Sequence, residues 1–132
     1  MGNFRDVGEM YEIYGALFDL VGRDSGIGRR LANAGLVVQF RLSHPEGMVT
    51  LDLRGPPMRG GTYVDYILGE CAIEPDVVFE TSSDFSNRFL QGKVNILRAL
   101  IKGQIRARGM VGMALRLIPL IEPVFEIYPT GS

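Results

Sequence analysis

The chain has one cysteine, Cys71, and one histidine, His44, among its 132 residues. A single cysteine excludes an intramolecular disulfide and a cysteine-based metal cluster. A zinc site would need several carboxylates to converge on these two residues, and no carboxylates are spaced for it. We therefore expect neither a metal nor a cofactor.

The sequence also lacks an excess of positive charge. It contains 14 Lys and Arg against 15 Asp and Glu, for a formal net charge of −1. The basic residues look scattered, and their densest pairs are Arg29-Arg30 and Arg106-Arg108. Proteins that bind DNA or RNA usually carry a basic excess, so nucleic acid is not an expected partner.

Long apolar runs are missing as well. No run approaches the roughly 18 residues of a membrane span, and the first residues lack the order of a signal peptide. A cytoplasmic location is the default expectation. Hydrophobic residues make up 46% of the chain and charged residues 22%. That composition is ordinary for a folded protein, and residues 1–132 are predicted to form a single domain with one core.

The first clear pattern is an amphipathic helix. Apolar residues recur at three- and four-residue steps from Val7 to Val21. The polar face between them carries four carboxylates: Asp6, Glu9, Glu12 and Asp19. Because anionic lipid headgroups would repel this face, we predict at most weak, transient and salt-insensitive contact with membranes.

Alternating apolar and polar residues predict a sheet. Residues 36–42 and 49–53 alternate cleanly and are joined by a hairpin-length turn. Three further strands are predicted, near residues 62–68, 76–81 and 104–108. One face of the sheet is expected to be polar and exposed, with Gln39, Arg41, Thr50, Asp52, Arg54, Arg106 and Arg108. The predicted fold is therefore α+β, a five-stranded, mostly antiparallel sheet with helices covering only one face.

Short helices follow the fourth strand. Ser83 is the predicted N-cap of one and Asn95 of the next. A final helix is predicted at residues 110–118, with Arg116 as its only charge. A helix that is apolar all round must be buried or must line something. Three arrangements are compatible with this pattern: packing in the core, a wall of a lipid cavity, and a dimer interface. The apolar tail at 124–128 is expected to lie on the surface of the domain.

No catalytic set is apparent. His44 is interpreted as an exposed turn residue and Cys71 as a small core residue. Asp52 and Asp65 are expected to approach each other on the polar sheet face, where they would be ordinary carboxylates, because an acid–base pair needs a cleft. The glycine-rich stretch at 22–28 follows a helix rather than a strand, which favours a connection over a nucleotide loop. We predict that the protein is not an enzyme.

An ordered set of motifs fills residues 76–117. It comprises Asp76 at a strand start, Ser83-Asp84-Phe85, Gly92-Lys93-x-Asn95, Lys102-Gly103, and Gly109 before an apolar helix. In this order the set resembles the C-terminal half of the sterol carrier protein type 2 family. The resemblance is close over about 42 residues and extends more loosely, by order of elements, to the first helix and hairpin.

This resemblance implies an apolar cavity between sheet and helices that holds a hydrophobic lipid for transport or presentation. The implied lining residues are Phe85, Phe89, Leu97, Leu100, Ile101, Met110, Met113, Ala114 and Leu117. The chain lacks the basic character of eukaryotic carriers and a peroxisomal tripeptide, so fatty acyl, phospholipid and isoprenoid ligands stand beside sterol. Two alternatives are an accessory module that presents a hydrophobic intermediate to a partner enzyme, and a small cofactor-free enzyme that uses the cavity.

Overall fold

A computed structural model of the protein describes residues 7–55 and 61–120. The predicted contact of the tail at 124–128 lies outside these residues. The helices are α1 (Val7–Arg23), α2 (Ile27–Ala32), α3 (Ser83–Leu90), α4 (Ile96–Lys102) and α5 (Val111–Leu115). The strands are β1 (Val37–Ser43), β2 (Gly47–Asp52), β3 (Asp65–Leu68), β4 (Val77–Ser82) and β5 (Arg106–Gly109).

The five strands form one sheet in the order β3-β2-β1-β4-β5. Three of its four strand pairs are antiparallel, as predicted, and β1 pairs with β4 in parallel. The parallel pair arises because the chain leaves β3 at one edge and crosses the sheet before it enters β4. Periodicity within a strand carries no information on its partner, so the sequence did not indicate this pair.

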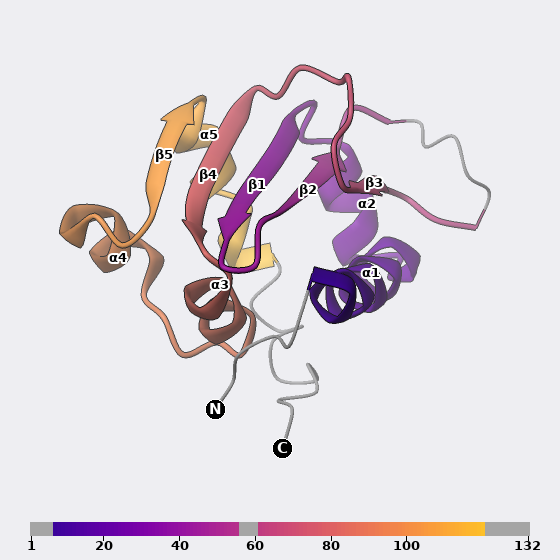
Figure 1. The fold of residues 1–132 in the computed structure, drawn as a ribbon. Coiled ribbons are helices and arrows are strands. Elements are labelled where there is room, and N and C mark those ends of the chain that lie inside the picture. Colours follow the sequence, from indigo (N-terminus) through magenta and orange to yellow (C-terminus); the bar gives the residue numbers. More distant parts are fainter. Residues whose placement is uncertain (1–6, 56–60, 121–132) are drawn as a thin grey trace.

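The helices lie on one face of the sheet, as predicted. Figure 1 shows α1, α3 and α5 on the same side, while α4 lies beyond β5 at the end of the sheet. The side chains that alternate toward this side include Phe40 and Phe79, whose rings stack with centroids 5.8 Å apart. Tyr14 of α1 packs toward them, 6.5 Å from the ring of Phe40. The core therefore lies between sheet and helices.

The opposite face is not fully exposed, which corrects the expectation of a solvated polar face. Gln39 is 2% exposed and Thr50 0% exposed. Segment 69–76 crosses this face between β3 and β4, and the Cys71 thiol lies 3.3 Å from the Thr50 hydroxyl. The Gln39 amide donates to Thr50 (3.1 Å) and accepts from Arg41 Nε (2.8 Å). These buried polar groups are tolerated because they bond one another.

The predicted N-cap of α4 is correct, whereas the predicted N-cap of α3 is wrong by one residue. Ser82, not Ser83, caps α3, since its hydroxyl accepts the N–H of Phe85 at 3.0 Å. Ser83 is buried instead, and its hydroxyl donates to the carbonyl of Pro45 at 2.7 Å. Asn95 caps α4 as predicted, by accepting the N–H three residues on at 3.0 Å. Either serine has the chemistry of a cap, so backbone direction decided between them.

The final helix is shorter and more exposed than its sequence suggests. Helix α5 ends at Leu115, and the chain then turns, with the N–H of Leu117 bonded to the carbonyl of Ala114 at 3.0 Å. Ala114 is buried, whereas Met110 is 45% exposed and Met113 42% exposed. The helix is therefore not buried on all sides, although its residues are apolar on all sides. One line of its side chains packs inward.

Candidate functional site

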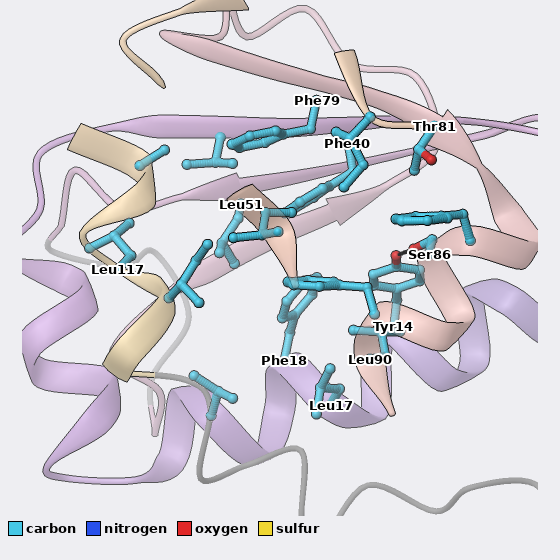
Figure 2. Close-up of a pocket in the computed structure, with 18 of the residues that line it drawn as sticks. Tyr14, Leu17, Phe18, Phe40, Leu51, Phe79, Thr81, Ser86, Leu90 and Leu117 are labelled. Atoms are coloured by element: carbon cyan, nitrogen blue, oxygen red, sulfur yellow. Dashed lines mark hydrogen bonds between the residues drawn. The ribbon is translucent and has the colours of Figure 1, made fainter. Parts of the chain in front are cut away.

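An apolar cavity of about 100 Å³ lies between the sheet and the helices. Side chains from every layer of the fold line it, as Figure 2 shows. The lining includes Tyr14, Leu17 and Phe18 of α1, Phe40, Leu51 and Phe79 of the sheet, Phe85 and Phe89 of α3, and Ala114, Leu117 and Ile118 of the C-terminal segment. The site thus depends on residues more than 100 positions apart in the chain.

The cavity has one weakly polar end. None of the described side chains that line it carries a charge. Tyr14, Thr81 and Ser86 supply hydroxyl groups, and Figure 2 shows them together at the end of the cavity away from Leu117. The Tyr14 and Ser86 hydroxyls bond each other, while Thr81 donates to the carbonyl of Gln104 at 2.8 Å. An ionised group would lose its hydration here without a compensating partner, so the cavity suits uncharged molecules.

A second, outer hollow of about 620 Å³ adjoins the cavity. It lies between the loop that follows α3, the start of α4 and the segment after α5. Phe89, Ile96 and Ile118 line both spaces, so these three side chains separate the inner cavity from the outer hollow. Lys93 is the one charged residue among the described residues that line the outer hollow.

The structure distributes the nine sequence-predicted lining residues over four environments. Phe85, Phe89, Ala114 and Leu117 line the inner cavity, and Leu97 and Phe89 line the outer hollow. Leu100 is half-buried against the core. Ile101 is 87% exposed, and Met110 and Met113 are also exposed. Contact of any of these nine with a ligand stays a prediction.

Sequence reasoning missed the contribution of α1 and the sheet. Tyr14, Phe18, Phe40 and Phe79 line the cavity, yet the lining residues that the resemblance implied all lie in the C-terminal half. The signal was present, because these side chains lie on the inward apolar lines of their helix and strands. What periodicity could not supply was the distinction between a position in solid core and one beside a cavity.

Asp52 and Asp65 lie opposite each other in the β2–β3 register, as expected. Both alternate to the face away from the cavity. Two hydrogen bonds from Arg54 hold the Asp52 carboxylate, at 3.0 and 2.9 Å. These hydrogen bonds lower the pKa of Asp52, with a smaller opposing effect of burial. A carboxylate held ionised by Arg54 on the face away from the cavity is not placed to work as an acid–base pair with its neighbour on a molecule in the cavity.

The described residues also bear on metal sites and on membrane spans. No three or more His, Cys, Asp and Glu side chains in residues 7–55 and 61–120 are arranged to hold a metal ion. No helix within those ranges combines the length and the apolar character needed to cross a bilayer.

Comparison with known proteins identifies one family and one fold. The model of the SCP-2 sterol transfer family matches residues 17–122. No curated protein sequence gives a significant match. Among solved structures, sterol carrier protein 2 from Yarrowia lipolytica in its apo form superposes with a TM-score of 0.67 at 19% identity, covering 97% of this chain and 98% of that one.

Two further structures share the fold. The sterol carrier protein domain 2 of Helicoverpa armigera gives a TM-score of 0.66 at 20% identity, over 88% of this chain and 87% of that chain. A protein described as "UbiJ-SCP2 Ubiquinone synthesis protein" gives 0.64 at 15% identity, over 91% and 93%. At these identities the structures establish a common fold. They do not establish a common ligand.

Proposed function

The chain belongs to the SCP-2 sterol transfer family, and from this premise we propose that it is a non-catalytic carrier of a hydrophobic lipid. The observation that carries the proposal is the cavity between sheet and helices, whose described lining has no charged side chain. Such a space favours an apolar chain and offers little to a polar substrate. Tyr14 is the one titratable side chain among the described lining residues, which supports binding over acid–base chemistry.

The energetics of apolar burial are sufficient for carriage. Burying a methylene gains about 0.8 kcal/mol, so a ~16-carbon chain offers roughly 12 kcal/mol before the cost of ordering. Micromolar affinity requires about 8 kcal/mol. A strong polar anchor is therefore unnecessary, and a cavity of this kind accepts several lipid classes.

The volumes constrain how the lipid would lie. Drug-sized ligands occupy roughly 300–1,000 Å³, which exceeds the inner cavity of about 100 Å³ but includes the outer hollow of about 620 Å³. We infer that the chain of the lipid occupies both spaces after Phe89 or its neighbours rotate aside. A charged headgroup would stay in the outer hollow near Lys93, whereas a hydroxyl or carbonyl group could reach Tyr14 and Ser86.

A substitution at Leu117 tests the carrier function. Leu117→Arg places a charge in the apolar cavity and should abolish saturable binding of a fluorescent fatty acid and a fluorescent sterol. Met113→Arg is the matched control, because it adds the same charge four residues earlier, at a side chain that is 42% exposed. Circular dichroism should show both variants folded, with Leu117→Arg destabilised by about 1–3 kcal/mol.

Two results would contradict the carrier proposal. One is full lipid affinity in a folded Leu117→Arg protein, and the other is an absence of saturable binding in the unmodified protein. Native mass spectrometry of the purified protein, followed by solvent extraction, would identify any lipid that co-purifies and so name the ligand class.

A second candidate is an accessory role beside an enzyme of lipid metabolism. The likeness to the UbiJ-SCP2 structure favours this role, since a cavity that shelters an isoprenoid chain could present its reactive end to a partner. The test is whether the tagged protein co-purifies with one enzyme in stoichiometric amount together with an isoprenoid lipid. Turnover of a hydrophobic substrate that Tyr14→Phe abolishes would instead indicate a small cofactor-free enzyme.

A further inference from the structure

The acidic residues of this chain are unevenly distributed, although the totals of the two charges nearly balance. Between residues 85 and 121 the sequence has seven Lys and Arg and not one Asp or Glu. The rest of the chain holds the other seven basic residues and all 15 acidic ones. Strand β5 and helices α4 and α5 therefore belong to a part of the chain with a strong excess of positive charge.

Strand β5 is an edge of the sheet within this basic part. The strand order ends with β5, and Figure 1 shows no strand on its outer side. The backbone N–H of Met110 donates to the carbonyl of Asp76, at the start of β4, at 2.9 Å. Because alternate residues of a strand bond to the same neighbour, the backbone groups of Arg108 also point toward β4. Those of Ala107, one position away, therefore point toward the open edge.

Two arginine side chains accompany this edge. Arg106 and Arg108 pair with the β4 residues on either side of the cavity-lining Phe79, so their side chains lie on the sheet face away from the cavity. Both are exposed, and neither forms an ion pair with a residue that the structure describes. Glu80 lies opposite Arg106 in the register, whereas Arg108 has no carboxylate opposite it. The edge therefore combines unpaired backbone groups with a net positive charge.

Exposed apolar side chains lie before and after β5 in the chain. Five large apolar side chains are exposed among the described residues, and four of them lie between positions 97 and 113. Ile101 of α4 is 87% exposed and Met113 of α5 is 42% exposed. Figure 1 shows α4 beside the start of β5 and α5 beside its end. A segment lying along the edge of β5 would therefore have apolar surface near both of its ends.

We propose that the open edge of β5 binds an extended acidic segment of a partner protein as a sixth strand. The backbone of Ala107 donates one hydrogen bond to this strand and accepts one from it. Alternate side chains of the segment are Asp or Glu and lie beside Arg106 and Arg108, while those between them are apolar and lie on the side of Ala107. The interaction uses no residue that lines the cavity, so it does not depend on lipid carriage.

A second copy of this chain fits the edge less well than an acidic segment does. If two β5 strands paired antiparallel about a two-fold axis at Ala107 or at Arg108, an arginine of one copy would lie opposite an arginine of the other. Like charges directly opposite each other destabilise a sheet. Charged side chains on an edge strand are a common protection against such pairing. The two arginines therefore disfavour self-association and favour a strand of opposite charge.

Peptide binding tests the proposal. The probe is a short, fluorescently labelled peptide of alternating glutamate and valine, and its binding is followed by fluorescence anisotropy. It should bind saturably, with an affinity that falls as salt rises. One control peptide alternates lysine and valine. The other is the glutamate peptide N-methylated at its valines, which keeps the charge but removes the N–H groups that would face Ala107. Neither control should bind saturably.

Substitutions in β5 locate the binding site. The double variant Arg106→Gln, Arg108→Gln should weaken peptide binding by about fivefold or more. The matched control is Arg23→Gln, Arg30→Gln, which removes the same charge from exposed positions of α1 and α2 and should leave binding unchanged. Ala107→Pro removes the outward N–H and should weaken binding by about tenfold, since an edge strand tolerates proline where the N–H faces solvent. All three variants should keep their affinity for a soluble fluorescent fatty acid.

Hydrogen exchange distinguishes strand addition from attraction between charges. The amide of Ala107 should exchange more slowly in the peptide complex, while the amides of α1 should be unaffected. Saturable binding that is absent, or unaltered in the Arg106→Gln, Arg108→Gln variant, would overturn the proposal. Equal binding of the N-methylated peptide would also overturn it, because the edge would then recognise negative charge alone, as on a lipid or nucleic-acid phosphate. If Ala107→Pro fails to fold, the arginine variant and the exchange measurement decide.

The same experiments separate strand binding from lipid carriage. Leu117→Arg should lose fluorescent lipid and keep its affinity for the glutamate peptide, because Leu117 lines the cavity and does not belong to β5. The β5 variants should show the reverse. Failure of one property therefore does not imply failure of the other.

Discussion

At the scale of residues, hydroxyl groups are the only polar side-chain groups among the described residues that line the cavity. Tyr14 and Ser86 are both buried and bond each other at one end of an otherwise apolar space. Their hydroxyls can each donate and accept, so a neutral oxygen of a ligand could join the pair. A hydrocarbon chain would gain nothing from it. These two residues therefore provide a basis for preference among lipids that differ only in a hydroxyl or carbonyl group.

Tyr14→Phe tests this preference. The variant should lose about two- to tenfold in affinity for a lipid whose hydroxyl or carbonyl reaches the polar end, because one net hydrogen bond contributes about 0.5–1.5 kcal/mol. Affinity for a plain fatty acyl chain, whose charged end stays outside, should be unchanged. The measurement is competition against one fluorescent probe by matched pairs of neutral lipids and fatty acids. Equal losses for both classes would show that Tyr14 acts through packing alone.

Glycine at position 109 shows how a single residue can fix the local path of the chain. Gly109 has a φ of +89° at the end of β5, a conformation that side chains rarely adopt. A Cβ there would also press against the carbonyl of Asp76 on the neighbouring strand. The side-chain carboxylate of Asp76 in turn accepts a hydrogen bond from the backbone N–H of Val37 at 2.8 Å. Two motif residues of the family resemblance thus hold the start of β4 between β1 and β5.

At the scale of elements, the inner cavity is separated from the outer hollow by residues of three segments. Phe89 comes from α3, Ile96 from the start of α4, and Ile118 from the segment after α5. The three side chains are half-buried, so each can change rotamer at a lower cost than a fully packed core residue. Motion of a few side chains, rather than of whole helices, would then be enough to admit a lipid chain.

Phe89→Ala should open this separation. Removing the ring joins the two spaces, so exchange of a bound fluorescent lipid should become faster. The free energy of unfolding should fall by less than the about 3–5 kcal/mol that is typical of a fully buried Phe, because Phe89 is half-buried. Stopped-flow displacement by excess unlabelled lipid measures the exchange rate. Met113→Ala, at an exposed side chain of α5, is the control and should leave the rate unchanged. An unaltered rate in Phe89→Ala would place the route of entry elsewhere.

At the scale of the whole molecule, the two ends of the fold carry different charge and different roles. Helix α1 carries Glu9, Glu12 and Asp19, while the end with α4 and β5 is basic and contains the outer hollow. The cavity between them is built from both halves of the chain. Ligand binding should therefore stabilise the domain as one unit, because the described lining connects α1, the sheet, α3 and the C-terminal segment.

Ligand-linked stability can be measured directly. A lipid that binds only the folded protein, present at 100 times its Kd, should add about 2.7 kcal/mol to the free energy of unfolding. For a domain of this size that corresponds to a rise in Tm of several degrees. Delipidated protein titrated with a candidate lipid in calorimetry provides the test, and Leu117→Arg should show no rise. Equal shifts in both proteins would point to binding outside the cavity.

The sequence by itself determined the local structure and the family. Amphipathic spacing predicted α1, strict alternation predicted the β1–β2 hairpin, and the ordered motifs of residues 76–117 identified the family that the comparison confirmed. The block of positive charge between residues 85 and 121 is also written in the sequence. Dense basic pairs do not reveal this block, because its signal is the absence of acidic residues over a long stretch.

Only the tertiary structure decided which surfaces these elements share. It paired β1 with β4 in parallel, buried Gln39 and Thr50 beneath segment 69–76, and left Ile101 of α4 exposed. It also brought Tyr14 and Leu117 to one cavity. The physical reason is that periodicity reports which side chains share a face, over a few residues of chain. What covers that face, and how tightly, depends on segments that meet it from far along the sequence.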